Sequence, residues 1–588
     1  MDYELTEERQ RYLDARGRIV LSACPGSGKT TSVVKKLKYL AEECQQKYGH
    51  YRGIACLSFT NKACDEIKSK YQLMHNENFA FPNIVSTIDS FIFEYIVSPF
   101  WKCSNLVHYK PFVTNDGEFI HSLYFATNSE GERFPLVGRQ QIHIMPPEKT
   151  SLGINARYFG NKKVEKEDEK EYIESIVKYR MRKGVINSND ALYLANLIMH
   201  NNPEIAKVII SRFPYVIIDE AQDTSLMQNN LFSILVEAGL SNIEYIGDSY
   251  QAIYEWRDAN PQFFSDLLAD DSFQKLVLSE NRRSVQRIID MYSKIRTDSD
   301  APIISHNVID RNIPIKVYFY NNENLSLVIN DYLEICKSNS LSNCHILVRG
   351  NSFIGNYLNT RQQVAYWKSD IPYMLIDVLD NYKRCNYSEA VYILKKIFVK
   401  LVFPTDFTKQ KEYLSENNCN ENSKLMAILP LIPTLEETFE NWTSKSQIVL
   451  KNCMGLEQEP DFSPKKRIDG FRIAELKRQS LSQYYSNNTN SQIPIETIHS
   501  SKGASYGGVL LVLSKNSAGN NISLSEFKRN GNEISEKQRL VYVACSRAEQ
   551  FLALAIPDSV SESQVIETLG VNADNISRVG IQMRLNLT

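Results

Sequence analysis

The most regular hydrophobic pattern near the N-terminus is a short apolar run followed by a polar loop. Residues 18–23 (RIVLSA) lie between a glycine and a proline, which is typical of a buried β-strand. A glycine-rich loop occupies residues 26–30, and apolar side chains then recur at helical spacing at Val33, Leu37 and Leu40. This pattern predicts a strand, a loop and a helix in direct succession.

Two later apolar runs also predict buried strands. Residues 215–218 (YVII) lead directly into Asp219 and Glu220, and residues 344–349 form a second run. A run that ends in carboxylates is typical of a strand buried on both faces, with its polar end at the ligand-binding edge of a parallel sheet. The hydrophobic pattern therefore favours an α/β fold.

The composition is that of an ordinary globular protein. The 588 residues are 43% hydrophobic and 23% charged, which excludes a disordered or collagen-like chain. At roughly 150 residues per domain, this length predicts about four structural units. The formal net charge is −2, from 67 basic and 69 acidic residues, so a nucleic-acid site would have to be a local patch.

The sequence gives no sign of export or membrane insertion. No apolar run approaches the ~18 residues that a membrane-spanning helix needs. The N-terminus is polar and acidic, without the basic and apolar regions of a signal peptide. The eleven cysteines include no CxxC pair and are interpreted as reduced thiols. We therefore expect a cytoplasmic protein with no membrane partner.

The loop after the first predicted strand has the features of a phosphate-binding P-loop. Its glycines allow backbone N–H groups to turn towards phosphate oxygens at the start of a helix. Lys29 would reach the β- and γ-phosphates, and the Thr30 hydroxyl would bind Mg²⁺. The alternative is an ordinary glycine-rich loop, since Ala23 stands where the strict motif has its first glycine. The nucleotide-binding candidates here are Ala23, Cys24, Pro25, Gly26, Ser27, Gly28, Lys29, Thr30 and Thr31.

The carboxylates after the second apolar run supply the acidic partner that a P-loop requires. Asp219 would hold Mg²⁺ through water, and Glu220 is the natural general base for an attacking water. An acidic helix N-terminus is the alternative interpretation. A GTPase is excluded because Asn61 and Lys62 begin a guanine-reading NKxD motif that has Cys64 where the aspartate belongs.

Six further segments distinguish one class of P-loop protein from the others. They are residues 57–67 (LSFTNKACDEI), 86–91 (STIDSF), 246–258 (IGDSYQAIYEWRD), 278–284 (LSENRRS), 497–504 (TIHSSKGA) and 539–548 (RLVYVACSRA). In this order and spacing, the chain resembles the UvrD/Rep/PcrA-like superfamily 1A DNA helicases from about residue 5 to 557. The resemblance implies two RecA-like parallel-sheet cores, each with an inserted, largely helical subdomain. It also implies the use of ATP and Mg²⁺ to move 3′→5′ on single-stranded DNA.

The resemblance gives roles to residues outside the P-loop. Gln10 corresponds to a glutamine that reads adenine, although it lies one residue further from Leu5 than usual. Gln251 would sense the γ-phosphate, and Arg283 and Arg547 would reach it from a second domain. Fixed cations of this kind stabilise charge that develops on a transferring phosphoryl group. The catalytic candidates are therefore Lys29, Glu220, Gln251, Arg283 and Arg547.

The same resemblance indicates a track for single-stranded DNA. Phe59, Tyr254 and Trp256 match aromatic residues that stack on bases or enclose them, an interaction that tolerates any sequence. Plain core packing is the alternative for each ring. The candidates for backbone or bridging contacts are Thr60, Asn61, Thr87, Arg257 and His499.

Three positions depart from the family pattern. Arg282 stands where a tyrosine usually stacks on adenine, Ser505 replaces a glutamate that contacts the ribose, and Asp89 stands where histidine is common. A guanidinium can also stack on a base. We therefore expect altered nucleotide affinity or coupling, with every residue needed for hydrolysis present.

The motif positions divide the chain into two cores and two insertions. The first core is predicted at residues 1–96 and 206–276, the first insertion at 97–205, the second core at 277–377 and 491–588, and the second insertion at 378–490. A basic cluster near the end of the first insertion is open to two interpretations, a solvated helix face or a contact with duplex DNA. It consists of Lys178, Arg180, Arg182 and Lys183.

A narrower resemblance concerns the pathway. In its compactness, and in the STIDSF segment followed by SPF at residues 98–100, the chain is similar to stand-alone UvrD-like helicases of anti-phage systems such as the Gabija helicase subunit. This implies an OLD-family nuclease as partner. Two functions therefore follow, in defence or in repair: a translocase that unwinds tailed double-stranded DNA, or a regulatory DNA-sensing ATPase that controls a nuclease and unwinds little.

Overall fold

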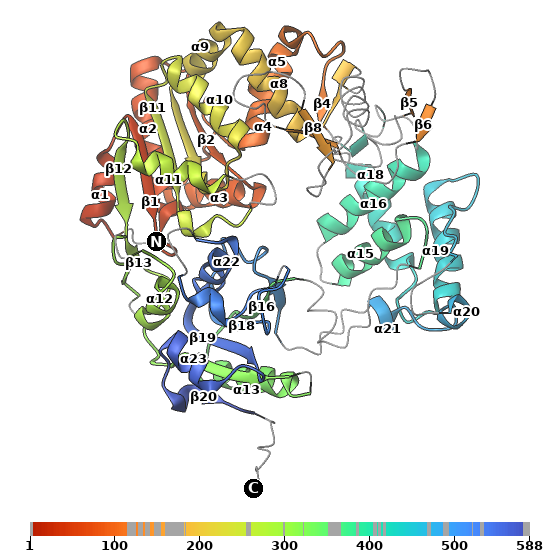
Figure 1. Ribbon diagram of the computed structural model, residues 1–588. Helices are drawn as coiled ribbons and strands as arrows, with labels where there is room; N and C mark the ends of the chain where they lie inside the picture. Colours follow the sequence, from red (N-terminus) through yellow and green to blue (C-terminus); the bar gives the residue numbers. More distant parts are fainter. Residues whose placement is uncertain are drawn as a thin grey trace. The chain divides into compact units, whose positions relative to one another are not determined.

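The chain folds into two compact units in the computed structural model (Figure 1). One unit comprises Met1–Tyr320, Asn330–Cys344 and Ile498–Thr588, and the other Asn321–Ile329 and His345–Thr497. The structure describes residues 4–113, 125–127, 133–135, 142–145, 155–158, 181–182, 184–254, 260–297, 300–307, 309–321, 323–350, 366–383, 387–403, 409, 413–414, 419–466, 472–485, 493–519, 521–529 and 534–579.

Six parallel strands form the first sheet, in the order β12-β1-β11-β10-β2-β3. They are β1 (Arg18–Ala23), β2 (Ile54–Ser58), β3 (Ile84–Thr87), β10 (Tyr215–Asp219), β11 (Asn242–Gly247) and β12 (Gln274–Leu278). Two strands, β2 and β10, are buried along their whole length, as expected for a parallel sheet with helices on both faces (Figure 1). Only β11 separates β1 from β10, so the two predicted phosphate-site strands end at the same edge of the sheet.

Helices precede and follow the strands of this first sheet along the chain. They are α1 (Glu7–Asp14), α2 (Lys29–Tyr48), α3 (Asn61–His75), α4 (Ile88–Ile92), α9 (Pro203–Arg212), α10 (Leu226–Glu237) and α11 (Pro261–Ala269), with short 3₁₀ turns η3 (Ala221–Asp223) and η4 (Ser249–Gln251). The apolar positions predicted for the first long helix, Val33, Leu37 and Leu40, are all buried in the core beneath α2. That prediction from helical spacing is confirmed.

Short elements occupy the region between α4 and α9. They are η1 (Phe93–Val97), α5 (Ser98–Phe100), η2 (Trp101–Ser104), β4 (Phe112–Val113), β5 (Phe125–Thr127), β6 (Arg133–Pro135), β7 (Ile142–Met145), β8 (Asn155–Tyr158), β9 (Val185–Ile186) and α8 (Ser188–Asn201). A reciprocal capping box between Asn187 and Asp190 starts the α8 helix. Arg182 is exposed, and Lys178, Arg180 and Lys183 of the predicted basic cluster lie outside the described residues.

A second parallel sheet lies in the same unit, with its strands in the order β18-β19-β15-β20. The strands are β15 (Lys316–Tyr320), β18 (Tyr506–Val512), β19 (Ala548–Pro557) and β20 (Ile576–Ser577), and a separate parallel pair joins β13 (Glu280–Asn281) to β14 (Ile304–Ser305). The accompanying helices are α12 (Gln286–Ser293), α13 (Leu325–Ser338), η7 (Leu524–Phe527), α22 (Glu536–Cys545), α23 (Glu562–Leu569) and η8 (Ala573–Asn575). The prediction of two parallel-sheet cores is confirmed.

The other unit is mainly helical in its described residues. It contains α15 (Ile371–Lys383), α16 (Tyr387–Val402), α18 (Cys419–Ile428), η6 (Leu429–Leu431), α19 (Phe439–Met454), α20 (Ile473–Leu476) and α21 (Ser482–Tyr485), together with the parallel pair β16 (Cys344–Val348) and β17 (Ile495–Thr497). Its core is built around Trp367 and Trp442, which are fully buried with ring centres 5.4 Å apart. The strand predicted at residues 344–349 is thus present as β16.

Candidate functional site

The P-loop segment forms a sharp turn between β1 and α2. Gly26 and Gly28 have φ angles of 72° and 78°, in the left-handed region that favours glycine. A Cβ atom on Gly26 would lie 2.5 Å from the Cβ of Arg283, so the loop has no room for a side chain there. Gly28 is the N-cap of α2, a helix whose first N–H groups have no acceptor within the helix. The turn therefore has the backbone form of a phosphate cradle.

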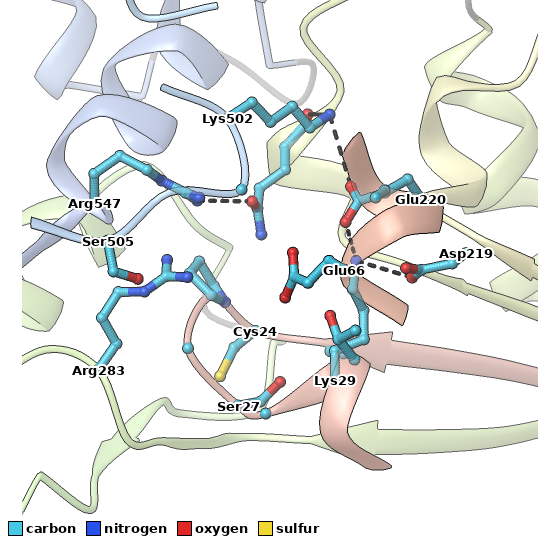
Figure 2. Close-up of a pocket in the computed structure, with 18 of the residues that line it drawn as sticks. Cys24, Ser27, Lys29, Glu66, Asp219, Glu220, Arg283, Lys502, Ser505 and Arg547 are labelled. Carbon is cyan, nitrogen blue, oxygen red and sulfur yellow. Dashed lines mark hydrogen bonds and ion pairs between the residues drawn. The ribbon is translucent and has the colours of Figure 1, made fainter. Parts of the chain in front are cut away.

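This loop lines a cavity of about 370 Å³. Eight of the ten predicted nucleotide-binding residues, at positions 23–30, contribute to its wall. Figure 2 shows how side chains from distant parts of the sequence converge on it. The other lining residues include Phe59, Glu66, Asp219, Glu220, Asp223, Gln251, Tyr254, Arg282, Arg283, Lys502, Ser505 and Arg547. All five predicted catalytic residues are thus brought together.

Lys29 is paired with both acidic residues at the end of β10. Its ammonium lies 3.2 Å from Oδ1 of Asp219 and donates a hydrogen bond to Oε1 of Glu220, a residue 191 positions away (Figure 2). Gln222 donates a 2.6 Å hydrogen bond to the other Glu220 oxygen. The P-loop lysine and the acidic pair, predicted from separate motifs, therefore meet in one cavity.

Glu220 has a backbone conformation that few residues other than glycine adopt. Its φ and ψ angles are 57° and 40°, in the left-handed region. Such a residue stores strain that the surrounding structure must hold, and positions of this kind cluster at active sites. The turn places the Glu220 carboxylate between two ammonium groups, those of Lys29 and Lys502.

The charges in the cavity shift one another's pKa because they are removed from water. Burial lowers the pKa of Lys29, but Asp219 and Glu220 outweigh burial and hold this pKa above its ordinary value. Burial raises the pKa of Asp219, against the opposing effect of Lys29. Burial would also raise the pKa of Glu220, but Lys29 and Lys502 hold it well below its ordinary range. Glu220 is therefore ionised at neutral pH, the state that a general base requires.

Two arginines, Arg547 buried and Arg283 partly buried, line the cavity. Arg547 is 1% exposed and donates a 2.9 Å hydrogen bond from Nη2 to Oε1 of Gln251. Arg283 donates a 3.0 Å hydrogen bond to the backbone oxygen of Ser546. Burial, with the neighbouring Arg283, lowers the pKa of Arg547 to about 9. An anion bound between two such cations would be strongly stabilised.

The residues predicted to hold Mg²⁺ fit that ion. Oδ1 of Asp219 is buried and, among the described residues, is satisfied only by its 3.2 Å ion pair with Lys29, and Thr30 lines the same cavity. A carboxylate and a hydroxyl are ligands that Mg²⁺ accepts beside phosphate oxygens. Oγ of Ser27 is also buried in the loop without a hydrogen-bond partner among the described residues. The cradle therefore has polar atoms to offer to a metal ion and to phosphate.

Gln10 is not among the residues that line the cavity. Its amide donates 2.8 Å hydrogen bonds to both carboxylate oxygens of Asp14, one turn further along α1. The neighbouring Arg9 contacts the P-loop instead and donates a 3.1 Å hydrogen bond to the backbone oxygen of Ser27. Thr31 also lies outside the lining. The structure thus brings Arg9, which sequence reasoning did not select, to the loop.

Two of the predicted DNA-stacking rings lie against each other. Phe59 and Tyr254 stack with ring centres 5.2 Å apart, and Tyr254 lies 6.0 Å from the ring of His499. Both stacked rings line the cavity that holds the P-loop. Trp256 and Arg257 lie outside the residues that the structure describes.

The remaining candidate DNA contacts are at helix N-termini. Thr60 caps α3 by accepting a 3.2 Å hydrogen bond from the N–H of Ala63, and Asn61 is the first residue of that helix. Thr87 caps α4 by accepting a 3.2 Å hydrogen bond from the N–H of Ser90. These positions follow β2 and β3, and helix N-termini there can bind anions such as backbone phosphates.

Comparison with known families decides the classification. The UvrD/REP helicase N-terminal domain matches residues 5–272, and the UvrD-like helicase C-terminal domain matches residues 405–558. The chain belongs to the UvrD-like helicase family. This confirms the resemblance inferred from the six sequence segments.

Three relatives of the chain show what it is similar to. ATP-dependent DNA helicase Rep of Buchnera aphidicola subsp. Schizaphis graminum is 24% identical over 61% of this chain and 54% of its own length. Gabija protein GajB of Bacillus cereus is 25% identical over 52% of each chain. ATP-dependent DNA helicase PcrA of Staphylococcus epidermidis is 21% identical over 93% of this chain and 82% of its own. The matches to this Rep and to GajB thus span about half of those proteins.

The three departures of the chain from the family pattern have distinct surroundings. Arg282 lines the cavity and forms ion pairs of 2.9 Å with both Glu4 and Glu280. Ser505 lines the cavity as well. Asp89 is not among the lining residues and accepts a 3.0 Å hydrogen bond from Gln228, so it joins α4 to α10.

Several charged lining residues were not selected from the sequence, among them Glu66, Asp223 and Lys502. Glu66 lies on α3 and is paired at 2.6 Å with Lys70, one turn further on. Asp223 and Lys502 are paired with each other. Each lies within a few residues of a quoted motif, but only the folded structure shows which charges meet. No helix among the described residues of the chain has the length and apolarity to cross a membrane.

Proposed function

We propose that this chain is an ATP-dependent DNA helicase that moves 3′→5′ along single-stranded DNA and unwinds tailed double-stranded DNA. The observation that carries the proposal is the meeting of five groups in one cavity: Lys29, Glu220, Gln251, Arg283 and Arg547. The names of the Rep and PcrA relatives support it.

The residues of the cavity would divide the work of ATP hydrolysis. Lys29 and the loop N–H groups would bind the β- and γ-phosphates, and Glu220 would accept a proton from the attacking water. Arg283 and Arg547 would stabilise charge that develops on the γ-phosphoryl group, with Gln251 orienting Arg547 through their hydrogen bond. Bound Mg²⁺, held by Thr30 and Asp219, would supply charge neutralisation on the phosphates.

The stacked pair Phe59 and Tyr254 would bind single-stranded DNA by stacking on its bases. Stacking on Phe59 and Tyr254 is worth about 1–3 kcal/mol per base and does not depend on sequence. These rings line the same cavity as the P-loop. A shift of the bound DNA base would therefore displace residues next to the nucleotide, and a shift of the nucleotide would displace residues next to the base. Trp256, Arg257, Thr60, Asn61, Thr87 and His499 are proposed as further contacts.

We propose the domain division that the motif positions predict. It places the first core at residues 1–96 and 206–276, the first insertion at 97–205, the second core at 277–377 and 491–588, and the second insertion at 378–490. A cytoplasmic location is part of the same proposal.

The likeness to GajB favours a second candidate function. In that alternative the chain is a DNA-sensing ATPase within a bacterial antiviral system, and it controls an OLD-family nuclease while unwinding little DNA itself. Copurification from the native host separates the two functions. A stable complex with a nuclease, together with ATP hydrolysis that DNA stimulates without unwinding, would support the regulatory function.

A strand-displacement assay tests the leading proposal. We expect ATP-dependent separation of a duplex with a 3′ single-stranded tail and little separation of one with a 5′ tail. Lys29→Ala should abolish strand separation because the P-loop loses its phosphate-binding cation. Unwinding that continues undiminished in Lys29→Ala would refute the proposal.

A further inference from the structure

The ammonium group of Lys502 contacts several functional groups at one point. It donates a 2.8 Å hydrogen bond to the backbone oxygen of Gln251 and another to the carboxylate of Asp223. It lies 3.8 Å from Oε2 of Glu220 and 4.9 Å from the centre of the Tyr254 ring. Figure 2 shows Lys502 reaching Glu220 from the segment that leads into the second sheet. The Lys502 side chain is only 10% exposed, so each of these attractions is stronger than in water.

These contacts connect the residues proposed to hydrolyse ATP with the ring proposed to bind DNA. Glu220 is the proposed general base, and the Gln251 side chain holds Arg547. Tyr254 stacks on Phe59 and is proposed to bind a nucleobase. A cation within about 6 Å of an aromatic ring is attracted to the ring face. Any change at that ring therefore changes the balance of forces on an ammonium that also faces Glu220.

We infer that Lys502 is a positioning residue that transmits occupancy of the Phe59–Tyr254 stack by a nucleobase to Glu220. The inference rests on the proposed function. A base that stacks on Tyr254 either moves the ring or competes for its face, and in both cases the ammonium loses part of its attraction to the ring. The ammonium then redistributes between Asp223 and Glu220, which changes how Glu220 is held.

The link must act in both directions. If DNA changes the interaction of the site with nucleotide by some factor, nucleotide changes the affinity for DNA by the same factor. Without the ammonium, the two sites lose this connection, although each can still bind its own ligand. The coupling between the sites is therefore the quantity to measure, in place of the rate of either reaction alone.

The test compares wild type with Lys502→Met, which keeps the apolar stem and removes the charge. Lys502→Arg is the conservative variant. Lys528→Met is the matched control, because Lys528 forms a surface ion pair with Glu567 at 2.7 Å and does not line the cavity. For each protein, steady-state ATP hydrolysis is measured with and without saturating oligothymidylate. Fluorescence anisotropy gives the affinity for the same oligonucleotide with and without a non-hydrolysable ATP analogue.

We expect DNA to stimulate ATP hydrolysis by wild type and by Lys528→Met, and nucleotide to change their DNA affinity by about 5- to 150-fold, the usual range for coupled binding. In Lys502→Met the stimulation should fall below about 2-fold, and the effect of nucleotide on DNA affinity should shrink as well. Lys502→Arg should retain part of both effects. Stimulation of Lys502→Met equal to that of wild type would overturn the inference and leave the proposed helicase function standing.

A double-mutant cycle with Tyr254→Leu tests whether the ring is the element that Lys502 senses. If the two residues form one link, the double variant should couple no more weakly than either single variant. Independent, multiplying effects would overturn the inference. Circular dichroism shows whether Lys502→Met folds. If it does not fold, the test is made with Tyr254→Leu, in which saturating DNA should no longer stimulate ATP hydrolysis. A wild type that DNA does not stimulate would overturn both this inference and the proposed function.

Discussion

Burial disfavours the ionised form of each charged residue in the cavity, and the oppositely charged partners keep these residues ionised. Burial alone would favour the neutral form of Lys29, yet two carboxylates hold it charged. Arg547 donates its hydrogen bonds to backbone oxygens and to the side chains of Gln251 and Ser546, and burial with Arg283 lowers its pKa to about 9. A nucleotide phosphate would balance the charges of this cavity. It would bring negative charge to the two guanidinium groups, and it would take the place of the carboxylates as the anionic partner of Lys29.

Asp223 provides a pH-dependent prediction at the scale of one residue. Burial raises its pKa from 3.8 to about 6, although Lys502 acts in the opposite direction. A raised pKa means that the folded state binds the proton more tightly than the unfolded state. The contribution of this group to stability is therefore fully present below pH 3.8 and is lost as the pH rises through about 6. The shift corresponds to a loss on the order of 3 kcal/mol.

The measurement uses Asp223→Asn, which cannot titrate. Urea unfolding of both proteins at pH 4.5 and 7.5 gives the difference between their free energies of unfolding. This difference should move in favour of the variant as the pH rises, because only wild type loses the proton. A difference that stays constant between the two pH values would contradict the prediction.

The element that the sequence specified best is the unit of β1, P-loop and α2. The apolar run at 18–23 is the strand Arg18–Ala23, and Val33, Leu37 and Leu40 form the buried face of the helix. Local pattern was sufficient here because one strand and one helix each bury a continuous set of side chains. Gln10 shows the limit of such reasoning, since adjacent positions on α1 point in different directions and Arg9 is the one that reaches the loop.

Gly26→Ala tests the P-loop as an element. Its φ of 72° disfavours any side chain, and the new Cβ would lie 2.5 Å from Arg283 and 2.6 Å from Oδ1 of Asn281. We expect the loop to shift and nucleotide affinity to fall by about tenfold or more, equivalent to a strain of 1–3 kcal/mol. Gly49→Ala is the matched control, because Gly49 also has a positive φ of 87° but nothing lies within 4 Å of its added Cβ.

Titration with a fluorescent ATP analogue measures the affinity of both glycine variants. The control should bind as wild type does, although it carries comparable backbone strain. Equal weakening of the two variants would show that general destabilisation, and not the close packing around Gly26, is responsible.

At the scale of the whole molecule, the sequence predicted two parallel sheets but not how their side chains combine. Continuous apolar runs such as residues 215–218 predicted individual buried strands, and the family resemblance predicted that these strands form two sheets. The contacts of Lys502 with Asp223, and of Arg547 with Gln251, join residues 279 and 296 positions apart. No local pattern contains such distances, so these pairs needed either the family resemblance or the fold.

The net charge of −2 has a consequence for the way the whole molecule would hold DNA. A binder that relies on phosphate contacts loses affinity steeply with salt, with a log–log slope of about −0.7 per phosphate contact on single strands. Because this chain offers a stacked pair, Phe59 and Tyr254, and no overall positive charge, we expect a shallow slope of about −3 or less in magnitude.

Phe59→Ala should weaken binding by about 1–3 kcal/mol and leave the slope unchanged, since stacking releases no counterions. Fluorescence anisotropy with oligothymidylate at several KCl concentrations gives both quantities. A steep slope in wild type, or a Phe59→Ala variant that binds as tightly as wild type, would show that phosphate contacts and not the aromatic pair hold the strand.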